Sequence, residues 1–265
     1  MTRCLVHPHR RRVPPASRPV PLPTASNSPS AFANSLDFAP DPIQSSVLDS
    51  EAPRLLLCST RQWGKSTVTA IKALHFALAH PQSTTLIAAP GLRQSSEFLA
   101  KVAFFLETLN LPRRTDRRNP RSLLLPNRAR LVAIPANRFT TRGFSPNLLI
   151  FDEAAFIPDP VIHALTPSLA ATRGHLWLLS TPNGQSGFFY HSWHGESEWT
   201  RFQVKASDCP RISQDFLAEQ RLLLGESAFQ SEFHCEFTPG PGQLIPRELL
   251  ERAVDPNATH WELPK

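Results

Sequence analysis

The sequence predicts an α/β fold, in which a mostly parallel sheet carries helices on both faces and forms a three-layer sandwich. Two observations predict it. From residue 37 onward, short apolar segments alternate with segments of helical periodicity, and strands separated by helices build βαβ units with parallel strands. In addition, two apolar segments end in polar residues, at 59–66 and 152–153, as expected where the carboxyl ends of parallel strands share one edge of a sheet.

The individual elements follow from length and periodicity. The run LLLC at 55–58 is short, apolar and followed by a polar loop, which indicates a strand. Phe98, Val102, Phe105 and Leu106 recur at helical spacing and indicate a helix. In chain order, we expect strands at 54–58, 84–89, 122–125, 130–134, 148–152, 175–180 and 201–206, and helices at 65–80, 92–109, 160–170, 213–224 and 227–235.

The composition excludes several classes of protein. At 265 residues, 41% hydrophobic and 19% charged, the chain has the composition of a soluble globular protein. No apolar run approaches the roughly 20 residues that cross a bilayer, so we expect no membrane span. Cys4, Cys58, Cys209 and Cys235 lack the C-x-x-C spacing of a zinc site, and we interpret them as reduced thiols rather than a disulfide framework.

Three regions are expected along the chain. Residues 1–36 are rich in proline, serine and arginine and contain no acidic residue, so they are predicted to be a disordered tail that cannot bury enough apolar surface to fold alone. Residues 37–240 form the predicted α/β domain, and residues 241–265 a linker remnant. The tail holds five arginines, and the rest of the chain holds 23 basic and 22 acidic residues. The folded part is therefore predicted to be close to neutral.

The segment 54–78 joins an apolar strand, a polar loop and a helix, which is the context of a phosphate-binding loop. Ser59 stands where the pattern has its first glycine, so an ordinary turn before a helix is the alternative. Backbone N–H groups of the loop would face the phosphates, Lys65 would pair with the β- and γ-phosphate oxygens of ATP, and the Ser66 hydroxyl would hold Mg²⁺. The predicted ATP-binding residues are Ser59, Thr60, Arg61, Gln62, Trp63, Gly64, Lys65, Ser66 and Thr67.

A second signature is the apolar run at 148–151 followed by Asp152 and Glu153. Asp152 would bind Mg²⁺ directly or through water, and Glu153 would polarise the water that attacks the γ-phosphate. A strand ending in a solvated acidic turn is the alternative. Together with the loop at 59–66, the pair indicates a P-loop nucleotide hydrolase with ATP and Mg²⁺ as cofactors.

Two further clusters bear on nucleic-acid binding. The aromatic residues Phe188, Phe189, Tyr190 and Trp193 indicate a helix face packed in the core rather than a base-stacking surface. Arginines gather between 113 and 142 and would suit a phosphate backbone or a neighbouring subunit, although arginine is frequent throughout the chain. These arginines are Arg113, Arg114, Arg117, Arg118, Arg121, Arg128, Arg130, Arg138 and Arg142.

Four segments occur in an informative order. They are Arg61-Gln62-Trp63-Gly64-Lys65-Ser66, the stretch from Thr141 to Ser145 that leads into LLIFDEAAFI, the stretch 176–193 and the stretch 207–237. In this order they resemble the ATPase domain of large terminase subunits, the motors that package DNA into tailed-phage and herpesvirus capsids. The resemblance covers about 38–240.

The resemblance implies roles for further residues. Gln44 would hydrogen-bond adenine, with a glutamine in a surface turn as the alternative. Arg61 would join Lys65 and Glu153 as a catalytic residue by neutralising charge at the γ-phosphate, in cis or toward a neighbouring subunit. The coupling motif, Ser180-Thr181-Pro182, would sense the γ-phosphate at the end of its strand, where a polar turn that caps the strand is the alternative.

The resemblance also implies ATP hydrolysis coupled to DNA packaging in the cytoplasm of a bacterial host. The implied partners are double-stranded DNA, further copies in a homo-oligomeric ring, a portal and a small terminase subunit. Large terminases carry a C-terminal nuclease domain, but only 28 residues follow Phe237, so we expect no DNA cleavage. Two alternatives stay open: another DNA-dependent, helicase-like ATPase, and a truncated prophage remnant that binds nucleotide without turnover.

Overall fold

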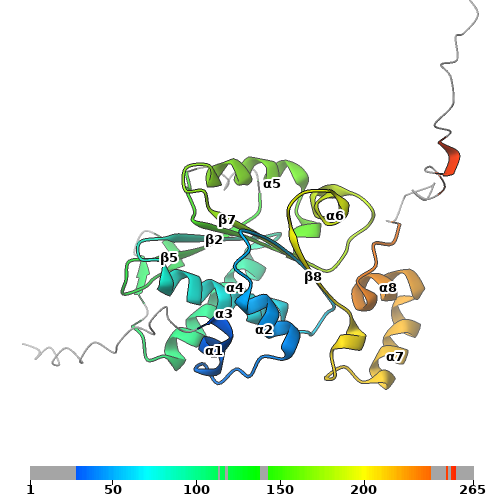
Figure 1. Cartoon of the computed structure of the whole chain (residues 1–265), viewed down its shortest axis with the longest axis horizontal. Coiled ribbons are helices and arrows are strands. Elements are labelled where there is room, and N and C mark those ends of the chain that lie inside the picture. Colours follow the sequence, from blue (N-terminus) through cyan, green and yellow to red (C-terminus); the bar gives the residue numbers. More distant parts are fainter. Residues whose placement is uncertain are drawn as a thin grey trace, which may run out of the picture.

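The computed structural model describes residues 28–112, 114–116, 119–137, 143–239, 249 and 252–254. Within these residues the chain forms one eight-stranded sheet in the order β3-β4-β5-β2-β6-β7-β1-β8, with helices on both faces (Figure 1). This arrangement confirms the predicted α/β fold.

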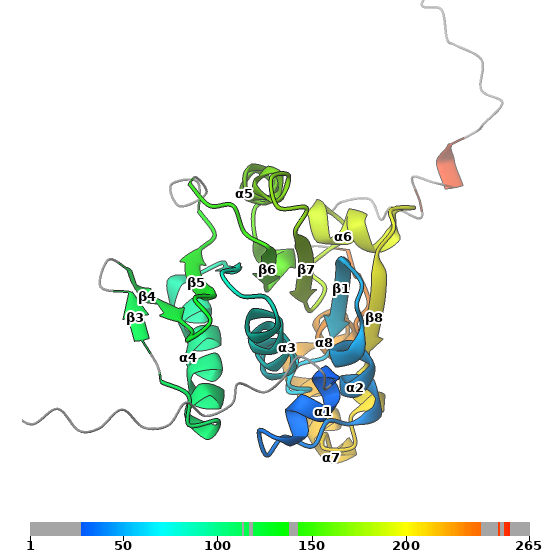
Figure 2. The same cartoon turned by 60° about the vertical axis from the view of Figure 1, so that its left-hand side comes forward.

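The sheet is parallel except at one edge. β1 (Arg54–Ser59) lies between β7 (His175–Ser180) and β8 (Thr200–Val204). β2 (Thr84–Ala89) lies between β5 (Arg130–Pro135) and β6 (Leu148–Asp152), and β6 pairs with β7. The antiparallel strands β3 (Arg114–Asp116) and β4 (Asn119–Leu124) extend the sheet beyond β5, opposite the β8 edge (Figure 2).

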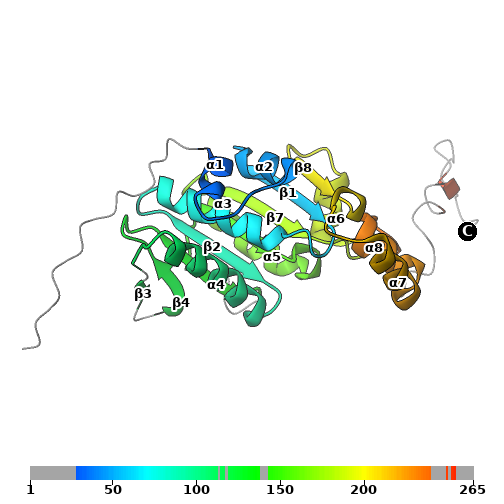
Figure 3. The ribbon, with the colours of Figure 1, turned by 90° about the horizontal axis from the view of Figure 1, so that it is seen from below.

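The helices form two unequal layers. α1 (Pro29–Asn34), α2 (Pro42–Asp49), α3 (Lys65–Ala79) and α4 (Leu92–Thr108) cover one face (Figure 3). The other face carries α5 (Asp159–Leu165), α6 (Gly187–His194) and the 3₁₀ helices η1 (Ala154–Phe156) and η2 (Thr166–Leu169). After β8 come η3 (Ala206–Asp208), α7 (Gln214–Leu224) and α8 (Glu226–His234), which lie at the β8 edge.

Each central strand contributes to two hydrophobic cores. In β1, Leu55 and Leu57 belong to the core beneath α1–α4, whereas Leu56 and Cys58 belong to the core beneath α5 and α6. Successive side chains of a strand point to opposite faces, so a strand covered on both sides is apolar throughout, as the run at 55–58 predicts.

The amino-terminal boundary of the domain differs from its prediction. Residues 29–34 form α1 rather than part of a disordered tail, and Phe32 and Leu36 are only 2% and 3% exposed. Asp49 of α2 accepts hydrogen bonds from the backbone N–H and hydroxyl of Ser30, at 2.8 and 2.6 Å. A helix this short is stabilised by tertiary packing, which local composition does not reveal.

Two other elements are shorter than expected. The helix predicted at 160–170 is α5 only to Leu165, after which the chain tightens into η2 around Pro167. The strand predicted at 201–206 is β8, which ends at Val204 because the chain turns into η3. The aromatic cluster of α6 is packed, as predicted: Phe189 and Tyr190 are buried, and both lie against Phe237.

The described cysteines fit the predicted chemistry. Cys58, Cys209 and Cys235 are buried free thiols, and Cys4 lies outside the described residues. A hydrogen bond between the thiols of Cys58 and Cys235, together with burial, raises the pKa of Cys58. In the part of the chain that the structure describes, no helix combines the length and the apolar character needed to span a membrane.

Lys72 of α3 is a charged residue within the fold, at 5% exposure. Its ammonium donates to the backbone carbonyls of Leu48 and Ser50, at 2.6 and 2.5 Å, and lies 5.3 Å from the centroid of the Trp177 ring. Burial lowers the pKa of Lys72 to about 8, against the opposing charges of Asp49 and Glu51.

We predict that wild-type stability rises with pH relative to Lys72→Met between pH 8 and about 10.5. In that window the unfolded chain keeps a proton that the folded chain loses, so the difference in unfolding free energy grows by about 3 kcal/mol. Urea denaturation of both proteins at several pH values measures it. A difference that stays constant across this window would contradict a depressed pKa for Lys72.

Candidate nucleotide-binding site

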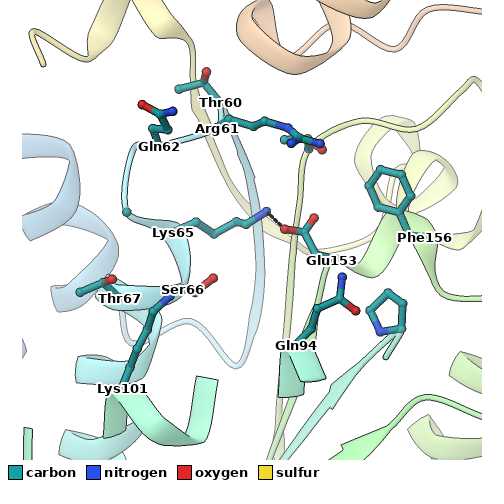
Figure 4. Close-up of a pocket in the computed structure, with 13 residues that line it drawn as sticks. Thr60, Arg61, Gln62, Lys65, Ser66, Thr67, Gln94, Lys101, Glu153 and Phe156 are labelled. Carbon is teal, nitrogen blue, oxygen red and sulfur yellow. Dashed lines mark hydrogen bonds and ion pairs between the residues drawn. The ribbon is translucent and has the colours of Figure 1, made fainter. Parts of the chain in front are cut away.

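The predicted site segments meet at the carboxyl edge of the parallel strands. A cavity of about 640 Å³ opens there between the loop after β1, the start of α4, the end of β6 and the end of β7 (Figure 4). It is lined by Thr60, Arg61, Gln62, Gly64, Lys65, Ser66, Thr67, Pro90, Gln94, Lys101, Glu153, Phe156 and Thr181.

The phosphate-binding loop bends at two residues in the left-handed region. Gln62 has φ of 63° and Gly64 of 101°. A Cβ at Gly64 would meet its nearest neighbour, Nε2 of Gln44, at 3.6 Å, so the backbone conformation rather than lack of space requires glycine. Gly64 is also the N-cap of α3 and provides no capping side chain, which leaves backbone donors of the first helical turn for an anion.

The Trp63 side chain holds the loop from the protein interior. This side chain is fully buried, and the Trp63 carbonyl accepts hydrogen bonds from Nε2 of Gln44 at 3.1 Å and from the Arg211 guanidinium at 2.8 Å. Ser59, at the end of β1, is also fully buried. Neither Ser59 nor Trp63 lines the cavity, so the structure does not bring these two side chains to the predicted ATP site.

Gln44, for which the resemblance implies a hydrogen bond to adenine, is bonded within the fold in this structure. It is 2% exposed, and its Oε1 accepts from the Asp41 N–H at 3.0 Å while Asp41 accepts from the Gln44 N–H at 2.8 Å. This capping box begins α2, and Nε2 holds the Trp63 carbonyl. Gln44 therefore lies behind the loop, outside the cavity lining, where its carboxamide supports the loop.

Lys65 and Glu153 form an ion pair across the cavity. Nζ of Lys65 lies 3.0 Å from Oε1 of Glu153, with side chains 10% and 29% exposed. Lys65 begins α3, and Glu153 directly follows β6 with φ of 56°, which is unusual for a residue other than glycine. The predicted phosphate-binding cation and the predicted water-activating acid are thus in direct contact.

Ser66 and Asp152 form a second contact. The Ser66 hydroxyl donates to Oδ2 of Asp152 at 3.4 Å, whereas Oδ1 is buried with no hydrogen-bond partner among the described residues. Burial raises the pKa of Asp152, against the nearby charges of Lys65 and Lys101. A hydroxyl beside an unsatisfied carboxylate oxygen fits Mg²⁺, which takes oxygen ligands and binds few protein groups because it retains water.

Arg61 lines the cavity, but its guanidinium is paired elsewhere. Nε and a terminal nitrogen donate to the two carboxylate oxygens of Glu232 in α8, at 2.7 and 3.1 Å. The backbone N–H of Arg61 also donates to the Glu232 carbonyl, at 3.3 Å. The Glu232 carboxylate raises the pKa of Arg61. The side chain is 65% exposed, so its charge is accessible to solvent in this arrangement.

The predicted coupling motif connects the site to two other elements. The Ser180 hydroxyl accepts from the Ala155 N–H of η1 at 3.2 Å, and the Pro182 carbonyl accepts from the Ser231 hydroxyl of α8 at 2.9 Å. Thr181, between them, lines the cavity. The motif therefore joins η1, the cavity and α8.

Four cavity residues were not predicted from the sequence. Pro90, Gln94 and Lys101 come from the segment that follows β2, and Phe156 comes from η1. The only signal for the first three is their position after the carboxyl end of a parallel strand, since they belong to no motif. Of the arginine-rich stretch, Arg113, Arg117, Arg118, Arg138 and Arg142 lie outside the described residues.

Comparison with known proteins identifies the family. Residues 56–252 match the family model described as the N-terminal region of the terminase large subunit of T4-like-virus type. The chain belongs to this terminase family. The large terminase subunit of Thermus phage G20c is 27% identical over 243 residues, which cover 78% of this chain and 50% of the relative. The chain thus spans about half the length of the curated relatives it matches.

Solved terminase structures share the fold. The ATPase domain of the large terminase of Thermus phage P74-26 superposes with a TM-score of 0.70 at 25% identity, covering 78% of this chain and 97% of that domain. The large terminase of another thermophilic bacteriophage superposes with a TM-score of 0.62 at 12% identity, covering 75% of this chain and 50% of that one. The described part of this terminase chain therefore has the fold of a terminase ATPase domain.

The position of Gln44 leads to a stability prediction. Gln44→Ala removes the Oε1 half of the capping box and the bond to the Trp63 carbonyl, so we expect the unfolding free energy to fall by about 1–3 kcal/mol. Gln203→Ala is the matched control, because Gln203 is exposed and its side chain donates one bond, to the Cys235 carbonyl. Urea denaturation compares them, and equal stabilities of the two variants would contradict a supporting role for Gln44.

Proposed function

We propose that this terminase chain is a Mg²⁺-dependent ATP hydrolase whose turnover drives translocation of double-stranded DNA during phage packaging. The observation that carries the proposal is the meeting of four side chains at one sheet edge: Lys65 with Glu153 at 3.0 Å, and Ser66 with Asp152 at 3.4 Å. A P-loop nucleotide hydrolase needs these four chemical groups at a triphosphate.

The contacts support the following roles for these residues. Ser66 and Asp152 would hold Mg²⁺, which when bound supplies positive charge to the β- and γ-phosphate oxygens. A triphosphate in the cavity competes with Glu153 for the Lys65 ammonium, because phosphate oxygens carry high negative charge. Release from Lys65 leaves the Glu153 carboxylate able to accept a proton from water. The water oxygen then bonds to the γ-phosphorus while the bond to the β–γ bridging oxygen breaks, giving ADP and phosphate.

Arg61 provides a further charge for this reaction. It lines the cavity, and its guanidinium would have to leave Glu232 of α8 to contact a phosphate. Because α8 also bonds the Pro182 carbonyl, such an exchange would alter the contacts of a helix that is bonded to the coupling motif. This connection supports a role for α8 and Ser180-Thr181-Pro182 in passing the nucleotide state to parts that grip DNA.

Membership of the terminase family supports the proposed setting. We place the reaction in the cytoplasm of the bacterial host, within a homo-oligomeric ring that meets a portal and a small terminase subunit. The second of the two solved terminases, from a thermophilic bacteriophage, was determined in complex with ADP, which is a property of that protein. For this chain, nucleotide binding is supported by the residues of its own cavity.

We predict that the purified chain hydrolyses ATP in the presence of Mg²⁺ and that duplex DNA accelerates turnover. Lys65→Ala is expected to lose both binding and turnover, and Glu153→Gln to lose turnover by roughly 10²- to 10⁴-fold while it still binds ATP. Glu97→Gln, on the exposed surface of α4, is the charge-matched control. Phosphate release assays measure turnover, and tight ATP binding by a wild-type chain without hydrolysis would contradict a motor and favour a remnant.

Arg61→Ala should lower turnover by about 10³-fold or more, the size of effect expected for an arginine that stabilises the transition state. Glu232→Gln serves as its counterpart, because it removes the partner carboxylate and keeps the arginine. We expect this variant to retain turnover. Single-turnover hydrolysis with bound ATP separates chemistry from affinity, and unchanged hydrolysis by Arg61→Ala would remove Arg61 from the catalytic set.

A further inference from the structure

The cavity contains a third cation, which comes from outside the phosphate-binding loop. Lys101 lies in α4, lines the cavity, and points toward Ser66 (Figure 4). The buried face of α4 is built from apolar residues such as Phe98, Val102 and Phe105, and Lys101 is not part of that face.

Lys101 differs from the other two cations of the cavity in its partners. Lys65 is paired with Glu153 at 3.0 Å, and Arg61 is paired with Glu232 at 2.7 Å. For Lys101 the structure shows no hydrogen bond or ion pair with any described residue. The Lys101 side chain is partly buried, and its ammonium is available to a negatively charged ligand in the cavity.

Lys101 lies at the predicted magnesium end of the cavity, where its side chain points toward Ser66 (Figure 4). Sheet order agrees with this placement. α4 follows β2, which neighbours β6 and its terminal acids, whereas the phosphate-binding loop follows β1 on the other side of β7.

We propose that Lys101 binds the terminal phosphate of the nucleoside triphosphate, from the α4 side of the cavity. This inference rests on the proposed ATP hydrolysis and adds a residue to it. A phosphate chain that runs from the loop after β1 toward Glu153 presents its terminal phosphate to the β2 and α4 side. Lys101 thus helps to distinguish a triphosphate from a diphosphate, whereas the loop backbone and the contact of Lys65 with the β-phosphate are common to both nucleotides.

The proposal is tested by nucleotide affinity rather than by turnover. Fluorescent analogues of ATP and ADP are titrated with Mg²⁺ into wild type, Lys101→Met, Lys101→Arg and Arg93→Met. Arg93 lies on the exposed surface of the same helix and pairs with Glu97, so its loss changes the net charge equally. Methionine matches the apolar stem of lysine, and circular dichroism checks that each variant is folded. Lys101→Gln replaces Lys101→Met if that variant does not fold.

We expect Lys101→Met to weaken ATP binding roughly 10- to 100-fold, as loss of a charge-assisted hydrogen bond does. ADP binding should change less than about threefold, and Lys101→Arg should recover most of the ATP affinity. An ATP affinity equal to that of Arg93→Met, or equal losses for ATP and ADP, would overturn the assignment of Lys101 alone. Failure of the wild type to bind ATP would instead overturn the proposed function together with it.

Discussion

The ion pair between Lys65 and Glu153 depends on the parallel sheet. Lys65 begins the helix after β1, and Glu153 follows β6, with β7 between the two strands. Because all three strands run in the same direction, their carboxyl ends meet at one edge, and two residues 88 positions apart come within 3.0 Å. If β6 were antiparallel, Asp152 and Glu153 would lie at the opposite edge of the sheet. The contacts of Lys65 with Glu153 and of Ser66 with Asp152 therefore depend on strand direction.

The second constraint is the support beneath the phosphate-binding loop. The loop conformation is stabilised by the buried Trp63 ring and by hydrogen bonds from Gln44 and Arg211 to the Trp63 carbonyl. This explains why Ser59 is compatible with the observed conformation of the loop. Ser59 ends β1 in ordinary extended structure, and the left-handed turns that favour glycine fall at Gln62 and Gly64. A missing first glycine therefore does not alter the bend that faces the cavity.

The sequence predicted the elements that depend on a local pattern of apolar residues. The apolar runs at 84–89, 148–152 and 175–180 gave the observed bounds of β2, β6 and β7, because strands buried on both faces must be apolar throughout. α1 was not predicted, since its stability comes from packing against distant helices. In the site, motif residues were placed at the correct edge, whereas Lys101 was found only through the structure, because no motif surrounds it.

Two of the three cations that line the cavity are paired with carboxylates. Lys65 and Arg61 contact Glu153 and Glu232, so under the proposed function a triphosphate would have to displace both carboxylates before it gains those two cations. The affinity for a triphosphate would therefore be the difference between the free energy of new phosphate contacts and that of the ion pairs that are broken. Arg61 loses little when its exposed pair breaks, whereas the more buried Lys65 loses more. The exchange at Lys65 is thus the more costly one, and in the proposed reaction it is also the one that frees the Glu153 carboxylate to accept a proton from water.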